Sequence, residues 1–140
     1  LMVVLYSPLQ MASDLPRNYA AKPELFQFIK DVPADWETSI ALAGEVGEHV
    51  IIARQERGSD DWVIGGITNE RARSTAITFD FLGQGDYRAS IYRDGPEADW
   101  ESNPYDAEVD TKTVNAETEL SIDMAAGGGF AISLHKISSE

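Results

Sequence analysis

The chain has 140 residues, enough for one domain with a short appendage, and apolar residues make up 43% of it, so a hydrophobic core can form. It contains no cysteine, which excludes disulfide bonds and thiolate metal sites within these residues. A formal net charge of −13, from 24 acidic against 11 basic side chains, argues against binding to nucleic acid, and against insertion into or binding to an anionic membrane.

The first residues are apolar and almost uncharged. Leu1–Tyr6 has no basic stretch before it and no small-residue cleavage site after it, and it is too short to span a bilayer. Apolar side chains from Leu1 to Ala12 fall roughly on one helical face, which predicts a helix with a kink at Pro8. Such an exposed surface is unusual in a self-contained domain, so we expect the chain to be the end of a larger protein.

A second helix is expected after the break at Asp14–Pro16. Pro23 is a favoured residue for a first helical turn, and Glu24 suits the positive end of the helix dipole. Pro33 then stops the helix. From Trp36 onward the apolar pattern alternates with a period of two, which is typical of strands.

About eight short strands separated by turn residues are predicted, and with no helix between them to cross parallel strands over, they indicate an antiparallel, Greek-key-like β-sandwich. They are Ile40–Leu42, His49–Arg57, Trp62–Thr68, Thr75–Phe81, Tyr87–Arg93, Ala107–Val114, Glu119–Met124 and Phe130–Ile137. The fold class is therefore mainly β, preceded by two short helices.

Four stretches occur in a fixed order: Ser7–Tyr19 (SPLQMASDLPRNY), Phe28–Ser39 (FIKDVPADWETS), Gly44–Asn69 (GEVGEHVIIARQERGSDDWVIGGITN) and Phe81–Trp100 (FLGQGDYRASIYRDGPEADW). Together they resemble the carboxy-terminal end of glycoside hydrolase family 97, which comprises bacterial retaining or inverting α-glucosidases and α-galactosidases. The similarity extends over nearly the whole chain.

The resemblance implies that residues 1–35 are the end of a catalytic (β/α)8 barrel with its connecting helices. Residues 36–140 would form the terminal β-sandwich. The catalytic carboxylates and a calcium ion would lie upstream, so the resemblance assigns no catalytic residue and no cofactor to these residues. It further implies the barrel as a partner, a role in homo-oligomerisation, and a periplasmic or otherwise exported parent protein.

Carboxylates are abundant, but turn chemistry accounts for those that cluster. Glycosidases use two carboxyl groups placed on either side of a sugar. Asp60 and Asp61 fall in a predicted hairpin turn, where Asp is favoured for bonding to the backbone. The loop Asp94–Glu101 is the densest acidic cluster, but its spacing does not match a calcium loop of the EF-hand type. His49 and His135 fall in predicted strands, and no orienting partner is identifiable for either.

Aromatic side chains offer one further candidate site. Trp62, Trp100 and Tyr105 could stack on pyranose rings, although core and junction packing is the preferred interpretation. Three functions remain open: a non-catalytic domain that supports the barrel and oligomerisation, a carbohydrate-binding module, and a protein-interaction module with no carbohydrate role. We expect these residues themselves not to form an enzyme, and the resemblance implies that their parent protein is a glycoside hydrolase.

Overall fold

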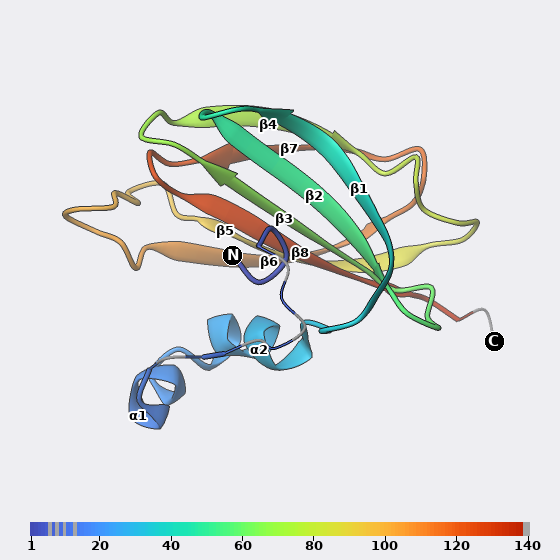
Figure 1. Cartoon of the computed structure of the whole chain (residues 1–140), viewed down its shortest axis with the longest axis horizontal. Helices are drawn as coiled ribbons and strands as arrows, with labels where there is room; N and C mark the ends of the chain where they lie inside the picture. Colours follow the sequence, from blue (N-terminus) through green and yellow to red (C-terminus); the bar gives the residue numbers. More distant parts are fainter. Residues whose placement is uncertain (6, 8, 10, 13, 139–140) are drawn as a thin grey trace.

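The computed structural model describes residues 1–5, 7, 9, 11–12 and 14–138, and it shows a two-layer β-sandwich with two short helices below one layer (Figure 1). The helices are α1 (Pro16–Ala20) and α2 (Pro23–Asp31). The strands are β1 (Trp36–Glu45), β2 (His49–Glu56), β3 (Trp62–Thr68), β4 (Arg73–Thr78), β5 (Tyr87–Asp94), β6 (Ala107–Val114), β7 (Glu119–Met124) and β8 (Gly129–Lys136). The predicted mainly β class is confirmed.

The larger sheet has the strand order β1-β2-β3-β8-β5-β6, and the smaller sheet pairs β4 with β7. Every pairing is antiparallel. The chain crosses to the smaller sheet after β3 and again after β6, and each time it returns, so β8 is inserted between β3 and β5. These crossings produce a sandwich from strands that follow one another in sequence.

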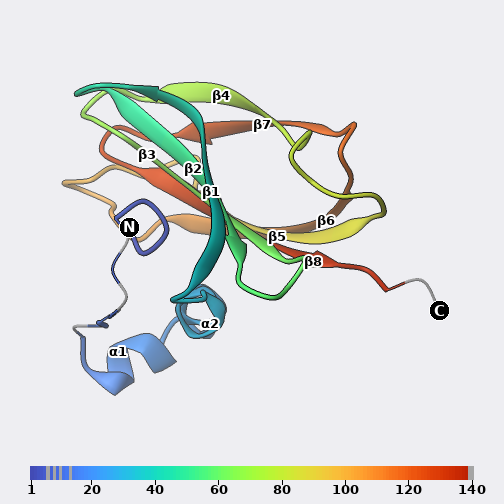
Figure 2. The same ribbon diagram turned by 45° about the vertical axis from the view of Figure 1, so that its right-hand side comes forward.

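The main core lies between the two sheets. Figure 2 shows these sheets as two layers. In the central strands, the alternation seen in sequence places every second side chain in this layer. In β8, Phe130, Ile132 and Leu134 are buried there, and in β5 the same holds for Tyr87, Ala89 and Ile91.

A second, smaller cluster covers part of the opposite face of the larger sheet. Val3, Trp36 and Val63 are its buried members, and Phe28 and Val32 pack against it. Val3 sits over Gly65, where a Cβ atom would collide with its side chain. The Nε of Arg54 also donates a hydrogen bond to the carbonyl of Val3 at 2.6 Å. The first residues of the chain and α2 are thereby attached to the sandwich.

The expected helix over Leu1–Ala12 is wrong in the described residues. Residues 1–5 form a turn closed by a hydrogen bond from the Leu5 N–H to the Leu1 carbonyl at 2.8 Å, the other described residues up to Ala12 are not helical, and the expected kink at Pro8 lies outside the described residues. The helix α1 begins instead at Pro16, a residue the sequence suggested as a break. Proline serves here as a first-turn residue, because the amide it lacks would be unpaired at that position. The helix at Pro23 is confirmed.

The strand predicted at Thr75–Phe81 is β4, which begins and ends earlier, at Arg73 and Thr78. Phe79 is fully buried although it lies after the strand, and Phe81 packs its ring on Trp62 with centroids 4.8 Å apart. Both rings anchor the start of the connection to β5 in the core, so apolar alternation continues beyond the hydrogen-bonded ladder.

Candidate functional site

The longest connection in the sandwich, residues 95–106 between β5 and β6, is held by its own side chains. One carboxylate oxygen of Asp99 accepts hydrogen bonds from the backbone N–H of Ser102 at 2.7 Å, from its hydroxyl at 2.7 Å and from the N–H of Glu101 at 3.1 Å. These donors, the Ser102 N–H above all, lower the pKa of Asp99 below its usual value. Asn103 adds a hydrogen bond to the carbonyl of Glu97 at 3.0 Å.

Two of the three aromatic candidates lie on this loop and are exposed. Trp100 is 63% exposed and its base rests on Gly127, while Tyr105 is 74% exposed. Lys22, just before α2, places its ammonium 4.8 Å from the centroid of the Tyr105 ring and donates to its carbonyl at 2.9 Å. The loop therefore presents two large rings on a braced backbone.

The third candidate, Trp62, is corrected by the structure. Its side chain is 6% exposed and packs in the main core against Phe81. A ring so placed has no free face for a sugar. Trp62 opens β3, where alternation directs its side chain toward the smaller sheet.

The clustered carboxylates bind backbone amides rather than facing each other across a cleft. Asp94 accepts from the N–H of Ala125 at 2.9 Å and of Gly129 at 2.8 Å, which ties the end of β5 to the β7–β8 turn. Asp106 accepts from the N–H of Glu97 at 2.9 Å. These contacts give Asp94 and Asp106, like Asp99, structural roles.

Asp60 and Asp61 join the β2–β3 turn to the last strand. Asp61 accepts from the backbone N–H of Lys136 at 2.8 Å, and its other oxygen lies 2.8 Å from the Nδ1 of His135. Asp60 pairs with the ammonium of Lys136 at 2.9 Å, which raises the pKa of that lysine. His135 therefore has a partner that sequence reasoning missed, because the two residues are 74 positions apart.

His49 differs from His135. Its Nδ1 is buried without a hydrogen-bond partner among the described residues. It lies at the start of β2, opposite Glu45 of β1 and Thr68 of β3. Among the described residues, no carboxylate accepts a hydrogen bond from its Nδ1.

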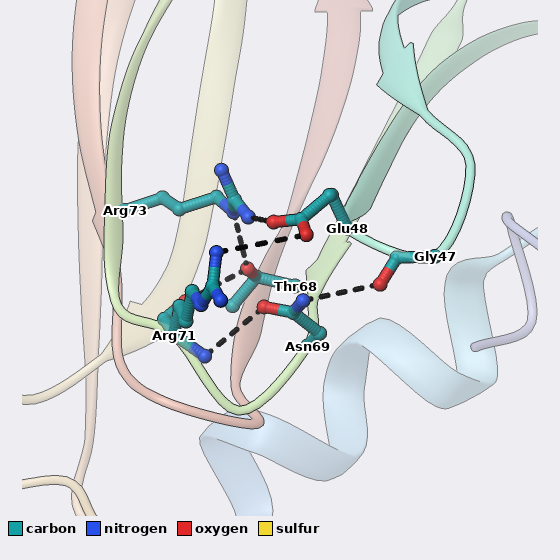
Figure 3. A network of polar contacts seen from close by, with 6 residues as sticks. All are labelled: Gly47, Glu48, Thr68, Asn69, Arg71 and Arg73. Carbon is teal, nitrogen blue, oxygen red and sulfur yellow. Dashed lines mark hydrogen bonds and ion pairs between the residues drawn. The ribbon is translucent and has the colours of Figure 1, made fainter.

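A network of polar contacts links the β1–β2 turn to the β3–β4 connection and to the start of β4 (Figure 3). Glu48, in the β1–β2 turn, pairs with Arg73 of β4 and, at 3.8 Å, with Arg71. The side-chain amide of Asn69 donates to the carbonyl of Gly47 at 3.1 Å, and its backbone carbonyl accepts from Gly127 at 2.7 Å. The network fixes the crossing from the larger to the smaller sheet.

Within the described residues, no group of three or more His, Asp or Glu side chains is placed to hold a metal ion. No helix among the described residues is long and apolar enough to cross a membrane.

Exposed apolar side chains concentrate in the first fifteen residues. Those of Leu1, Leu5, Leu9, Met11 and Leu15 are between 52% and 76% exposed. Exposed apolar side chains of this kind are surfaces that another protein surface could cover.

Comparison with known proteins gives a consistent picture. Residues 35–135 match the family described as glycosyl-hydrolase 97 C-terminal, oligomerisation. A retaining alpha-galactosidase of Bacteroides thetaiotaomicron is 37% identical over 96% of this chain and 20% of its own length. A probable retaining alpha-galactosidase of Streptomyces bingchenggensis is 30% identical over 94% of this chain and 19% of its own length. The chain thus spans about a fifth of the length of the curated relatives it matches.

Among solved structures, a glycoside hydrolase family 97 enzyme from Pseudoalteromonas sp. strain K8, in complex with panose, superposes with a TM-score of 0.94. It is 48% identical, and the match covers 97% of this chain and 22% of that one. A beta-arabinopyranosidase shares the fold, with a TM-score of 0.74 at 20% identity. The family match and the common fold lead to one conclusion: this chain belongs to glycoside hydrolase family 97 and corresponds to its C-terminal, oligomerisation domain.

Proposed function

We propose that this domain is the non-catalytic end of an α-glycoside hydrolase, where it joins copies of the enzyme and supports the catalytic barrel. The observation that carries the proposal is the match of residues 35–135 to an oligomerisation domain. The clustered carboxylates described above are occupied by backbone amides and cations, which agrees with chemistry carried out elsewhere.

The parent enzyme in this proposal hydrolyses α-galactosides or α-glucosides. Relatives described as retaining alpha-galactosidases favour the first, and the panose complex of the Pseudoalteromonas enzyme favours the second. The experiment compares hydrolysis of p-nitrophenyl α-galactoside and α-glucoside by the full-length protein and by residues 1–140 alone. We expect turnover only with the full-length protein, and turnover by the 140 residues would overturn the proposal.

Residues 1–35 are proposed to be the end of the barrel with its connecting helices. Two observations support this division: the family match begins at residue 35, and Leu1, Leu5 and Leu9 are exposed on a segment attached to the sandwich mainly through Val3. Hydrogen exchange of the full-length protein tests it. Protection at Leu5 that is no higher than in residues 1–140 alone would contradict a barrel contact.

The proposal also places calcium in the upstream region and the parent protein in the periplasm or outside the cell. The described residues offer no ligand set for calcium, so the prediction is that chelation changes the activity of the full-length enzyme and leaves the melting temperature of residues 1–140 unchanged. Fractionation of the native host would test the location.

A second candidate function, carbohydrate binding, is favoured by the two exposed rings of the 95–106 loop. Trp36 and Trp62 are 8% and 6% exposed, so quenching by a sugar would report on Trp100. Titration with a soluble maltooligosaccharide, with Trp100→Ala as the comparison, separates this function from oligomerisation. Absence of quenching at millimolar sugar would exclude it.

A further inference from the structure

The sandwich has four strand edges without a neighbouring strand among the described residues: those of β1 and β6 in the larger sheet and one each on β4 and β7. Such an edge presents backbone N–H and C=O groups that can pair with another chain. An oligomerisation domain built from strands therefore has an evident way to associate, provided that one of its edges fits a second copy.

Three of the four edges are poorly suited to self-pairing. The pairing of β1 with β2 is irregular between Trp36 and Thr38 and again between Ala41 and Ala43, and such bulges protect an edge. The strands β4 and β7 have six residues each. Antiparallel pairing of β7 with itself about Ser121 would place Glu119 opposite Asp123, and like charges in that position are unfavourable.

The edge of β6 is different because it is long and regular. Its eight residues pair with β5 in unbroken register. Val109, Thr111 and Thr113 are all exposed and share one face of the strand. Residues branched at Cβ favour strand pairing, so these side chains support the addition of a further strand.

The charges at this edge are balanced. Arg93 of β5 contacts Glu108 at 2.8 Å and Asp110 at 2.9 Å. Lys112 supplies a second positive charge. This edge therefore carries two acidic and two basic side chains, whereas the whole chain has a net charge of −13. Two copies of such an acidic chain repel each other in general, and a locally neutral surface is where that repulsion is least.

We propose that β6 pairs antiparallel with β6 of a second copy, about a two-fold axis at Thr111, and so joins two larger sheets into one. In this register Asp110 lies opposite Lys112 of the partner subunit, twice by symmetry, and Val109 lies opposite the partner's Thr113. The inference rests on the proposed function, since it names the surface through which this domain associates.

The charges select this register. Moving the axis by one residue along β6 places Asp110 opposite the partner's Asp110, or Lys112 opposite the partner's Lys112, depending on the direction. Either arrangement brings like charges together on the axis. The same charged side chains discourage pairing with an unrelated strand, so they give the edge specificity for its own copy.

A cysteine placed on the axis tests the geometry directly. These residues contain no cysteine, and opposed residues in an antiparallel pair are close enough for a disulfide. We expect Thr111→Cys in the full-length protein to form a covalent dimer under mild oxidation. Thr113→Cys is the matched control, because Thr113 faces Val109 of the partner subunit and its own copy lies well beyond disulfide reach.

Charge reversal gives a second test that does not depend on oxidation. Lys112→Glu and Asp110→Lys each turn two attractive pairs into two repulsive ones, so each variant alone is expected to raise the dimer dissociation constant about tenfold or more. An equimolar mixture of the two variants restores opposite charges in both pairs, and we expect it to associate. Asp80→Lys, an equal charge change at an exposed loop residue, is the control and should associate as the wild type does.

The outcomes separate this inference from the proposed function. A wild-type protein that stays monomeric at every concentration overturns both. A wild-type oligomer that is unaffected by either charge variant, with no cross-link at position 111, overturns pairing through β6 and leaves oligomerisation in place. Cross-linking at 111 but not at 113, together with rescue in the mixture, supports the inference.

Discussion

The sandwich and the 35 residues before it differ in how far their apolar side chains are buried. In the strands, side chains such as Ile64, Ile132 and Leu134 are completely buried between two sheets. In the first fifteen residues Val3 is buried, while Leu1, Leu5 and Leu9 are more than half exposed. The sandwich closes its own core, whereas the first fifteen residues bury little of their apolar surface against it.

The largest expected difference in the free energy of unfolding between the two regions concerns the core. Ile132 lies in the centre of the larger sheet and is fully buried, so Ile132→Ala should lower the free energy of unfolding by about 3 kcal/mol. Leu9→Ala, at a side chain that is 71% exposed, should change it by less than about 0.5 kcal/mol. Urea denaturation measures both, and equal costs would mean that the segment is as well packed as the sandwich.

A smaller effect is expected where the sandwich is held by a carboxylate. Asp94→Ala removes the acceptor for the N–H groups of Ala125 and Gly129, which should cost about 1–3 kcal/mol. Asp80→Ala, at an exposed acid in the β4–β5 connection, is the control. If the two variants have the same urea midpoint, then Asp94 does not stabilise the turn.

The attachment of the leading segment should be weaker still. Val3→Ala removes two buried methyl groups from the smaller cluster on the larger sheet and is expected to cost about 1 kcal/mol. Leu5→Ala should leave stability unchanged. Hydrogen exchange at Val63 and Gly65 would detect the loss, and unaltered protection there would show that Val3 does not hold the segment in place.

The smallest effect is local and depends on pH. Hydrogen bonds from Ser102 and Glu101 lower the pKa of Asp99, so the ionised carboxylate stabilises the loop. This contribution is present above the usual pKa of an aspartate and is lost as the pH falls through the lowered value of the folded state. The amide resonance of Ser102 should therefore keep its position to a more acidic pH than an ordinary Asp would allow. In Asp99→Ala the titration of this resonance should disappear.

Much of the sandwich follows from local rules. Alternation in Tyr87–Arg93 and Phe130–Ile137 predicted strands that the structure has, and Pro23 and Pro33 delimit a real helix. The first expected helix failed because a single apolar face does not fold a segment whose covering surface is absent from the local sequence.

The functional surfaces were harder to predict because they depend on strand order. The insertion of β8 between β3 and β5 brings Asp61 to His135 and leaves β6 at an edge, and neither result is encoded in neighbouring residues. Trp62 and Trp100 look alike as residue types, yet one closes the core and the other remains exposed. The resemblance to family 97 identified the domain where local chemistry could not.

The role in oligomerisation is tested most directly by sedimentation velocity of the full-length protein with and without residues 36–140. We expect an oligomer for the intact protein, with association that weakens on dilution, and a monomer after removal of the sandwich. A truncated protein that sediments as the same oligomer would contradict it, since the contacts between copies would then lie outside this domain.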